Sequence, residues 1–397
     1  MDMEIKDMAS ELEDDVMEAM DMEEPMSDDE LQGVIGGEID DAVDFIDNII
    51  SPIRAEATEY YRGDPFGDEE DGRSQVISMD VRDTVQAILP SLMRIFTGSE
   101  QAVEYIPQGP EDVEAAEQAT DYANFIMYRD NDGFLTLHSA FKDALIRKAG
   151  IVKVYWDEKT SVENYEMSGL DDAALAAIAS DPKAMIEIQV SRPSGDPMID
   201  PMTGMMIEAP LIHDVSVKYE TKDGRVQIEA LPPEEFLIDR RAKSMEEADF
   251  IAHRRTVTIS ELVAMGYDED EVEDLATGVD ELDINVERYT RNPALTTMTN
   301  NRTDEAMRKV MYYECYTKVD FDGDGIAELR KVCMAGSGKK ILMNEPCAVV
   351  PFAVFCPDPE PHDFFGMSVA DVTMDVQRIK SVIMRNTLDS LALSIHP

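Results

Sequence analysis

Basic residues, histidine and cysteine are scarce in this chain, and each scarcity disfavours a class of function. The 397 residues include 84 Asp and Glu against 35 Lys and Arg, which gives a formal net charge of −49. A protein that grips nucleic acid by neutralising many phosphates needs a basic surface, so the composition argues against that class. An acidic surface serves solubility or a high-salt environment, and it also lets a phosphate backbone slide past without adhering.

The residues that usually carry catalysis or redox chemistry are also thinly spread. The four cysteines form no CxxC pair, and we expect them to be reduced thiols, most of them buried. The five histidines are scattered, and the chain has neither an HExxH nor a GxSxG motif. We therefore predict no enzymatic activity and no cofactor. No apolar run approaches the roughly 18 residues that a membrane-spanning helix needs, and the acidic start lacks the features of a secretory signal.

The turn Asp320–Gly325 matches the opening of a calcium-binding loop. Asp320, Asp322 and Asp324 stand at its first, third and fifth positions, and a glycine at the sixth allows the sharp turn. The match then fails, because Lys331 occupies the twelfth position, where such loops place a bidentate glutamate. We favour a hairpin turn that uses Asp and Gly for backbone reasons, and we keep the three aspartates as candidate Ca²⁺ ligands.

The order of predicted elements indicates an α+β fold, with a helical N-terminal half, a mostly antiparallel β-rich region and a long C-terminal helix. Residues 1–32 form an acidic arm, which we expect to be disordered because it can bury little apolar surface. Residues 33–365 form a mixed α+β domain, and residues 366–397 form the terminal helix. Gly366 marks the boundary between the last two.

The terminal helix has an unusually clear pattern. Ser368, followed three residues later by Asp371, is an N-terminal capping pair. One apolar stripe runs along about 27 residues at spacings of three and four, through Val369, Val372, Val376, Ile379 and Ile383. The opposite face carries Asp371, Asp375, Arg378, Ser381 and Arg385. Two arrangements remain open: the helix folds back on its own domain, or its stripe packs against a neighbouring molecule.

Several separated blocks of the sequence together resemble one known family. The blocks are 72–74, 78–85, 89–98, 150–156, 231–236, 320–330 and 365–371. In this order they resemble the portal proteins of tailed bacteriophages, in the branch found in short-tailed phages. The resemblance covers about residues 40–397, and several blocks in family order are more specific than any single motif.

The resemblance implies a structural protein that forms a ring, usually of twelve subunits, at one vertex of the capsid. A separate terminase motor packages DNA through the ring, the DNA later leaves by the same route, and the tail attaches there. The implied partners are other copies of this chain, the major capsid protein, the terminase large subunit, head–tail adaptor proteins and double-stranded DNA read without sequence recognition, with no membrane. The implied location is the virion, with assembly in the host cytoplasm.

Members of this family have a wing of mixed α/β structure, a stem helix, a clip, a second stem helix and a crown. The resemblance implies that residues 33–365 form the wing and residues 366–397 the first stem helix, and we expect the clip, the second stem helix and the crown to be absent from this chain. The candidate channel or subunit-interface residues are Asp371, Asp375, Arg378, Lys380 and Arg385. The alternative function is a calcium-dependent binding or adhesion module built on the Asp320–Gly325 turn.

Overall fold

The structure is a computed structural model that describes residues 25–98, 101–181, 184–194, 198–199, 206–207, 211–275, 285–293 and 305–395. The chain divides into two compact units. The first comprises the described residues up to Val154 and those from Ile228 onward, and the second comprises Tyr155–Gln227. Every site residue predicted from the sequence lies in the first unit.

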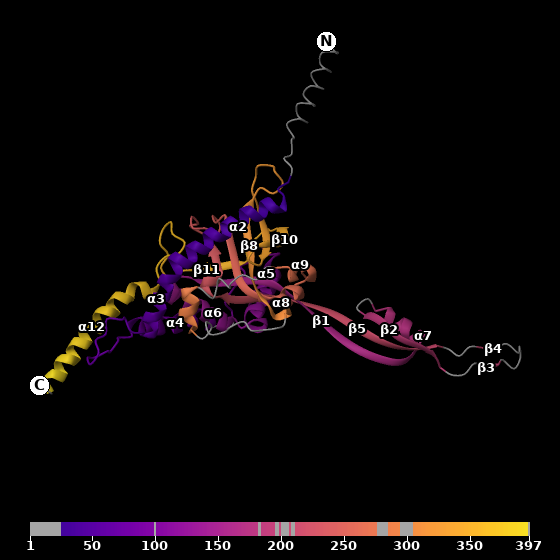
Figure 1. Cartoon of the computed structure of the whole chain (residues 1–397), viewed down its shortest axis with the longest axis horizontal. Helices are drawn as coiled ribbons and strands as arrows, with labels where there is room; N and C mark the ends of the chain where they lie inside the picture. Colours follow the sequence, from indigo (N-terminus) through magenta and orange to yellow (C-terminus); the bar gives the residue numbers. More distant parts are fainter. Residues whose placement is uncertain are drawn as a thin grey trace, which may run out of the picture. The chain divides into compact units, whose positions relative to one another are not determined.

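The described elements confirm the predicted α+β fold, with helices first, antiparallel strands next and a long helix at the end (Figure 1). The helices are α2 (Asp28–Phe45), η1 (Ile46–Ile50), α3 (Ser51–Arg62), α4 (Asp80–Thr97), α5 (Val113–Phe125), η2 (Ile126–Asp130), α6 (Gly133–Arg147), α7 (Asp172–Ala179), η3 (Pro233–Glu235), α8 (Ile259–Ala264), α9 (Glu269–Glu273), α11 (Val286–Arg291), η5 (Glu305–Met307) and α12 (Val369–Ile395). The strands are β1 (Gly150–Asp171), β2 (Ala184–Pro193), β3 (Met198–Ile199), β4 (Met206–Ile207), β5 (Leu211–Leu231), β6 (Phe236–Ile238), β7 (Phe250–Thr258), β8 (Lys309–Val319), β9 (Glu328–Ala335), β10 (Lys340–Pro346) and β11 (Phe352–Phe355). Among these, no described helix is long and apolar enough to cross a membrane.

Helix α2 contributes to the main core because its apolar residues share one face. Leu31, Ile35, Ile39 and Ala42 follow one another at spacings of three and four and are at most 1% exposed. They join the buried residues of the five-stranded sheet in one cluster. The helix starts at Asp28, before the boundary at residue 33 that we predicted for the folded domain.

The disorder predicted for the acidic arm falls mostly on residues 1–24, which lie outside the described residues. That part of the prediction stays a prediction.

The main sheet has the strand order β10-β9-β8-β7-β6, and all neighbouring strands are antiparallel. Strands β8 and β9 form the hairpin that the sequence predicts around the Asp320 turn, with register pairs running from Tyr312↔Ala335 to Val319↔Glu328. Both strands are largely buried. The turn therefore sits at the tip of a rigid hairpin.

A second core lies among α3, α4, α6 and the first turn of α12. It includes Val81, Val85 and Leu89 from one stripe of α4, together with Ala370 of α12. Beside this core, β1 pairs with β11 from Gly150↔Phe355 onward. A β-carbon at Gly150 would lie 2.2 Å from the carbonyl oxygen of Ala140, so this close approach of α6 to β1 requires glycine.

The second unit is built on the continuations of β1 and β5, which lie side by side, with β2 at the edge of the sheet. Strand β2 pairs antiparallel with β5, and Ser191 lies directly opposite His213. Asp171 caps helix α7 by accepting a hydrogen bond from Ala174 N at 2.8 Å. Strands β1, β2 and β5 belong to the β-rich middle region that the sequence predicts.

Candidate functional site

Helix α12 begins at the capping pair that the sequence predicts. The Oγ atom of Ser368 accepts a hydrogen bond from Asp371 N at 3.1 Å, and Asp371 Oδ2 accepts from Ser368 N at 2.7 Å. Lys148 Nζ pairs with the same carboxylate oxygen at 2.9 Å. The 27 residues of the helix span about 40 Å. The capping pair and the Lys148–Asp371 ion pair together fix where the helix leaves its domain.

Beyond Ala370 and Met374, which pack on the second core, the face of α12 that lies on its own domain is polar. Gln377 and Ser381 are 0% exposed. Gln377 Oε1 accepts from Val81 N and its Nε2 donates to Tyr60 O, both at 2.9 Å. Ser381 Oγ accepts from Ser78 N at 2.9 Å. These backbone groups belong to the end of α3 and the approach to α4, where helix ends leave donors and acceptors without intrahelical partners. The polar side chains therefore satisfy groups that apolar ones could not.

The same face continues one and two turns further. Arg385 donates to Asp68 at 2.7 Å and also pairs with Glu69, and the bond from Arg385 lowers the pKa of Asp68. Asp389 Oδ1 accepts from Ser74 N at 2.8 Å. Gln377 and Asp389 are not among the five candidate residues predicted on this helix. Their four-residue spacing through 381 and 385 is the signal that could have identified them.

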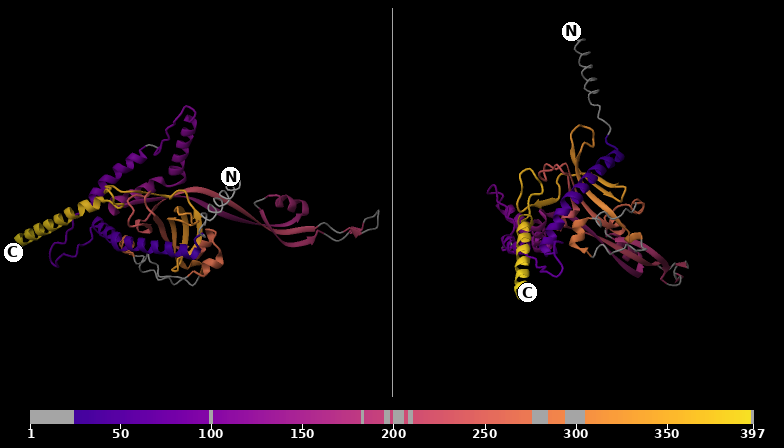
Figure 2. Two further views of the ribbon diagram at one scale, coloured as in Figure 1. Left: turned by 90° about the horizontal axis from the view of Figure 1, so that it is seen from above. Right: turned by 60° about the vertical axis from the view of Figure 1, so that its left-hand side comes forward.

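Val369, the first residue of the predicted apolar stripe, packs against the second core, but the rest of the stripe is exposed. Val372, Val376, Ile379 and Ile383 are 59, 51, 61 and 58% exposed. Figures 1 and 2 show the helix extending beyond the other helices toward its C-terminal end. The helix therefore lies on its own domain, mainly through polar side chains, whereas Val372, Val376, Ile379 and Ile383 have no partner among the described residues. Packing of these four against a neighbouring molecule stays a prediction.

The five candidate residues on this helix fall into two groups. Asp371, Lys380 and Arg385 pair with charged groups of their own domain, so their side chains position α12. Asp375 and Arg378 are exposed on the helix surface. Neither forms an ion pair among the described residues, and Arg378 also interacts with the Tyr60 hydroxyl of its own domain.

The Asp320 turn shows what its carboxylates do in the folded chain. Asp320 accepts hydrogen bonds from two glycine amides of the turn at 2.9 and 2.8 Å, and Asp324 accepts from the next backbone amide at 2.7 Å. Ligand atoms of Asp320, Asp322 and Glu328 lie within 4.8 Å of one another, whereas Asp324 is not part of that group. Arg330 pairs with Glu328 at 3.1 Å. The carboxylates thus already stabilise a hairpin turn.

A buried group of charges joins α3, α6, η3 and α11. Arg54 and Glu287 are at most 1% exposed and lie 3.5 Å apart, and Arg147 Nε lies 3.6 Å from the same carboxylate. Arg291 pairs with Glu234 at 2.5 Å. Burial, followed by the nearby charge of Glu287, raises the pKa of Glu234 to about 7. These ion pairs hold α3, α6, η3 and α11 together, because removing one partner would leave the other charge buried and unpaired.

A second buried group lies between β1 and the main sheet. Lys153 and Lys331 both pair with Glu314, the latter at 3.1 Å. Burial alone would raise the pKa of Glu314, but the two lysines lower it to about 2. His253 lies beside Lys153, and burial lowers its pKa. This group ties the start of β1 to the sheet.

In the second unit, His213 links a serine and an aspartate. Its Nδ1 lies 2.7 Å from Ser191 Oγ and its Nε2 lies 2.8 Å from Asp172 Oδ1. The Asp172 side chain is 77% exposed, whereas an aspartate that orients a catalytic histidine is buried. The contacts therefore fasten α7 to the β2–β5 pair.

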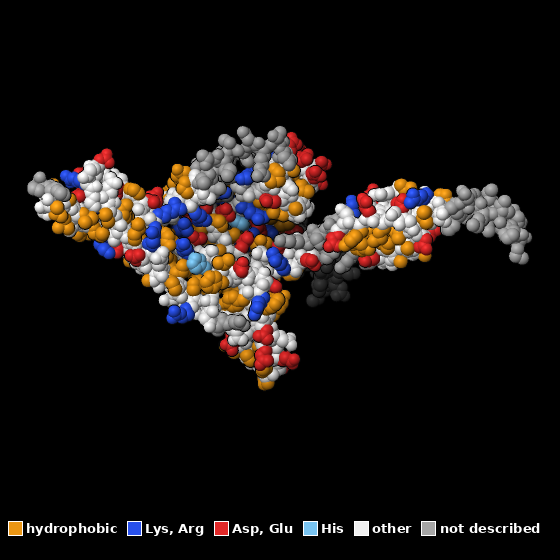
Figure 3. All heavy atoms as spheres, turned by 90° about the horizontal axis from the view of Figure 1, so that it is seen from below, with side chains coloured by type: hydrophobic (Ala, Val, Ile, Leu, Met, Phe, Trp, Pro, Cys, Tyr) orange, Lys and Arg blue, Asp and Glu red, His pale blue; other side chains and the backbone are white. Residues whose placement is uncertain are grey.

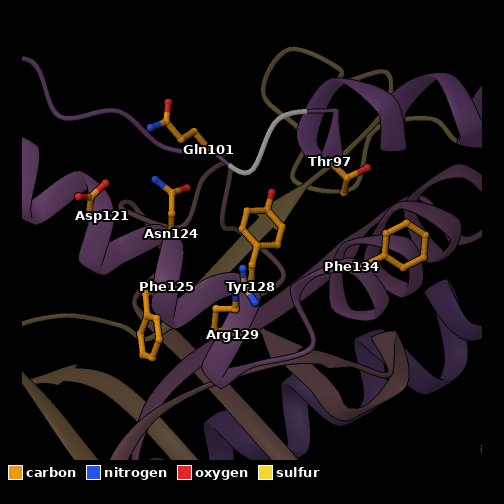
Figure 4. Close-up of a pocket in the computed structure, with 8 residues that line it drawn as sticks. All are labelled: Thr97, Gln101, Asp121, Asn124, Phe125, Tyr128, Arg129 and Phe134. Carbon is orange, nitrogen blue, oxygen red and sulfur yellow. The ribbon is translucent and has the colours of Figure 1, made fainter.

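A cavity of about 560 Å³ lies between the end of α4 and the α5–η2–α6 segment. Figure 4 shows the ring of Tyr128 in its middle, with Phe125 and Phe134 on opposite sides. The Tyr128 hydroxyl donates to Phe96 O at 2.5 Å, and Asn124 bonds to the backbone around residues 102–103. Its central polar groups are therefore already engaged within the chain.

A polar face seated on its own domain and an unpartnered apolar stripe are features of a subunit built to assemble with others. Comparison with known families identifies the class as phage portal proteins. The chain belongs to the family described as Phage SU10 portal protein, whose model matches residues 31–397. This is a family of structural proteins. A search of curated proteins finds no match to the chain.

Proposed function

We propose that this chain is one subunit of a ring at a single vertex of a phage capsid. The ring is a conduit: a separate terminase motor drives DNA through it during packaging, and the DNA leaves through it at ejection. In this proposal the chain performs no catalysis. The family match over residues 31–397 supports the class of protein, and the exposed apolar stripe of α12 is the observation that supports assembly.

The seating of α12 favours a contact with a neighbouring copy rather than with the subunit's own domain. The polar face already lies on that domain through Gln377, Ser381 and Arg385. An identical neighbour offers a closed arrangement in which every stripe is covered, because a head-to-tail contact that closes by rotation forms a ring. We take twelve subunits from the family resemblance.

The free energy gained by covering the stripe shows whether the stripe alone can hold a ring together. Its four residues are a little more than half exposed, so covering them contributes about 1 kcal/mol each, or roughly 4 kcal/mol per contact. Association costs an estimated 4–15 kcal/mol in lost freedom. The stripe therefore requires further contacts between the wing-like parts of neighbouring subunits. Ring closure then gives the two end subunits the second contact that every other subunit already has.

The outer partners follow from the position of such a ring. It would contact the major capsid protein at the vertex, head–tail adaptor proteins on the outer side and the terminase during packaging. Asp375 and Arg378 are exposed charges of α12 without an ion pair among the described residues, and in this proposal they face the channel or a neighbour. The net charge of −49 would limit adhesion of DNA as it passes.

The test compares Ile379→Asp with the matched control Val349→Asp. Both residues are exposed, at 61 and 73%, but Val349 lies outside α12. Native mass spectrometry and negative-stain imaging should show rings with a central hole for the wild type and Val349→Asp, and mainly small species for Ile379→Asp. A wild type that stays a monomer under every condition tried contradicts the proposal, and a monomer that responds to calcium would favour the alternative binding module.

A further inference from the structure

A cavity of about 500 Å³ opens among α3, α6 and α11, and cationic side chains dominate its lining. The charged and ring-bearing residues that line it are Tyr61, Arg62, His138, Lys142, Asp143, Arg147 and Arg291. Four bases thus face one carboxylate, in a chain where acids outnumber bases by 84 to 35. Figure 3 shows Lys and Arg side chains gathered beside a histidine on one face of the first unit.

Two of these bases form no ion pair within the described part of the chain. Arg62 donates to backbone carbonyls of α11, one of them at 2.7 Å. The ammonium group of Lys142 lies 5.3 Å from the centre of the Tyr61 ring. Outside the lining, Arg82 lies over the same ring at 5.7 Å and donates to backbone carbonyls of α3. Three positive charges therefore surround this region without an ion pair among the described residues, although the charge of Arg62 also acts on the carboxylate of Glu59.

The lining also holds buried donors that lack an acceptor. The Nε atoms of Arg147 and Arg291 are both inaccessible and make no hydrogen bond. The Nε atom of Arg147 lies 3.6 Å from Glu287 Oε1, which is too long for a hydrogen bond. Buried donors of this kind are rare because leaving them unpaired is costly. The Oε1 atom of Glu287 is likewise buried without a hydrogen bond and pairs with both Arg147 and Arg291, so these two arginines are neutralised within the chain. The charges left for a ligand in this cavity are those of Arg62 and Lys142.

We propose that this cavity binds a phosphate group. Guanidinium groups and a lysine held by packed helices match an anion that carries several acceptor oxygens and up to two negative charges. A carboxylate offers two oxygens and a single charge, so it would satisfy fewer of these donors. The phosphate can come from free phosphate or pyrophosphate, or from a nucleic-acid backbone, and both sources share this chemistry. The inference does not depend on ring assembly.

Lys142→Gln is the sharpest test, because Lys142 contacts only an aromatic ring in the described structure and its loss should not disturb the fold. Lys340→Gln on β10 is the matched control, since Lys340 is exposed and outside the lining. Phosphate and pyrophosphate are titrated by calorimetry, and a short DNA duplex by fluorescence anisotropy, on the full chain at constant ionic strength. Lys142→Gln should weaken binding about tenfold, as expected for losing one charge-assisted hydrogen bond, Lys142→Arg should restore it, and Lys340→Gln should leave it unchanged.

Binding of pyrophosphate without the duplex would assign a free phosphate, and duplex binding that depends on Lys142 would assign the nucleic-acid backbone. Should Lys142→Gln fail to fold, as judged by circular dichroism, His138→Gln replaces it with the same expected direction. The proposal is overturned if no phosphate ligand binds, if the two Lys→Gln variants bind equally, or if a glutamate-rich peptide binds more tightly than pyrophosphate.

Discussion

Replacing Gln377 with leucine is the most direct test of the polar contacts that hold α12 on its own domain. Leucine has a similar volume, but it leaves Val81 N without an acceptor at the start of α4. The carbonyl of Tyr60 also loses a donor, yet it still accepts from Gly63 N at 3.1 Å. Most of the cost therefore arises at Val81, and we expect about 2 kcal/mol against the seated helix.

Hydrogen exchange is the appropriate assay, because the chain has two units and a single unfolding free energy is not defined for it. A loss of about 2 kcal/mol should speed exchange of α12 amides roughly thirtyfold. The control is Asn386→Leu, which places leucine at an exposed position of the same helix and should leave exchange nearly unchanged. All variants are compared in the same oligomeric state, since assembly itself protects amides. If Gln377→Leu exchanges no faster than Asn386→Leu, these polar contacts do not hold the helix.

Three further predictions concern the buried charges and the acidic turn. The pKa of Glu314 is lowered to about 2, so its stabilising contribution should be present above about pH 4.5 and lost as the pH falls toward 2. Thermal melts of Glu314→Gln should lack that dependence, and an equally steep fall would contradict it. The pKa of Glu234 is raised to about 7, so its pH dependence has the opposite sign: stability should decline as the pH rises from about 4.5 to 7. Glu234→Gln should flatten this decline in thermal melts. An unchanged slope would refute the prediction. Calcium should not shift the melting temperature through the Asp320–Gly325 turn, because its carboxylates already accept backbone amides, and a saturable rise would restore the metal site.

Local signals in the sequence correctly predicted where α12 begins and where the β8–β9 hairpin turns. The capping pair Ser368 and Asp371 forms as expected, because capping depends on residues three positions apart. The β8–β9 hairpin was predicted for the same reason, since its two strands adjoin one turn. Features that depend on a few neighbouring residues can be inferred from a single sequence.

The orientation of α12 could not be predicted, because it depends on backbone groups far away in the chain. Gln377 bonds to Tyr60, 317 positions earlier, and nothing local to the helix reveals that these carbonyls and amides need partners. The pattern of the helix alone therefore left both arrangements of the stripe open. The buried pair of Arg54 and Glu287 was missed for the same reason, since the two residues come together only in the folded chain.

The hydrogen bonds that hold α12 on its domain also fix the direction in which its exposed stripe points. Hydrogen bonds are directional, so contacts through Gln377, Ser381 and Arg385 fix the rotation of the helix about its own axis. An apolar seat would specify that rotation less strictly, because hydrophobic burial has no preferred direction. Every copy of the chain therefore presents its exposed stripe at the same angle before any partner arrives. A ring that closes by repeated rotation needs this uniformity, since a small angular error at each contact would accumulate around the circle.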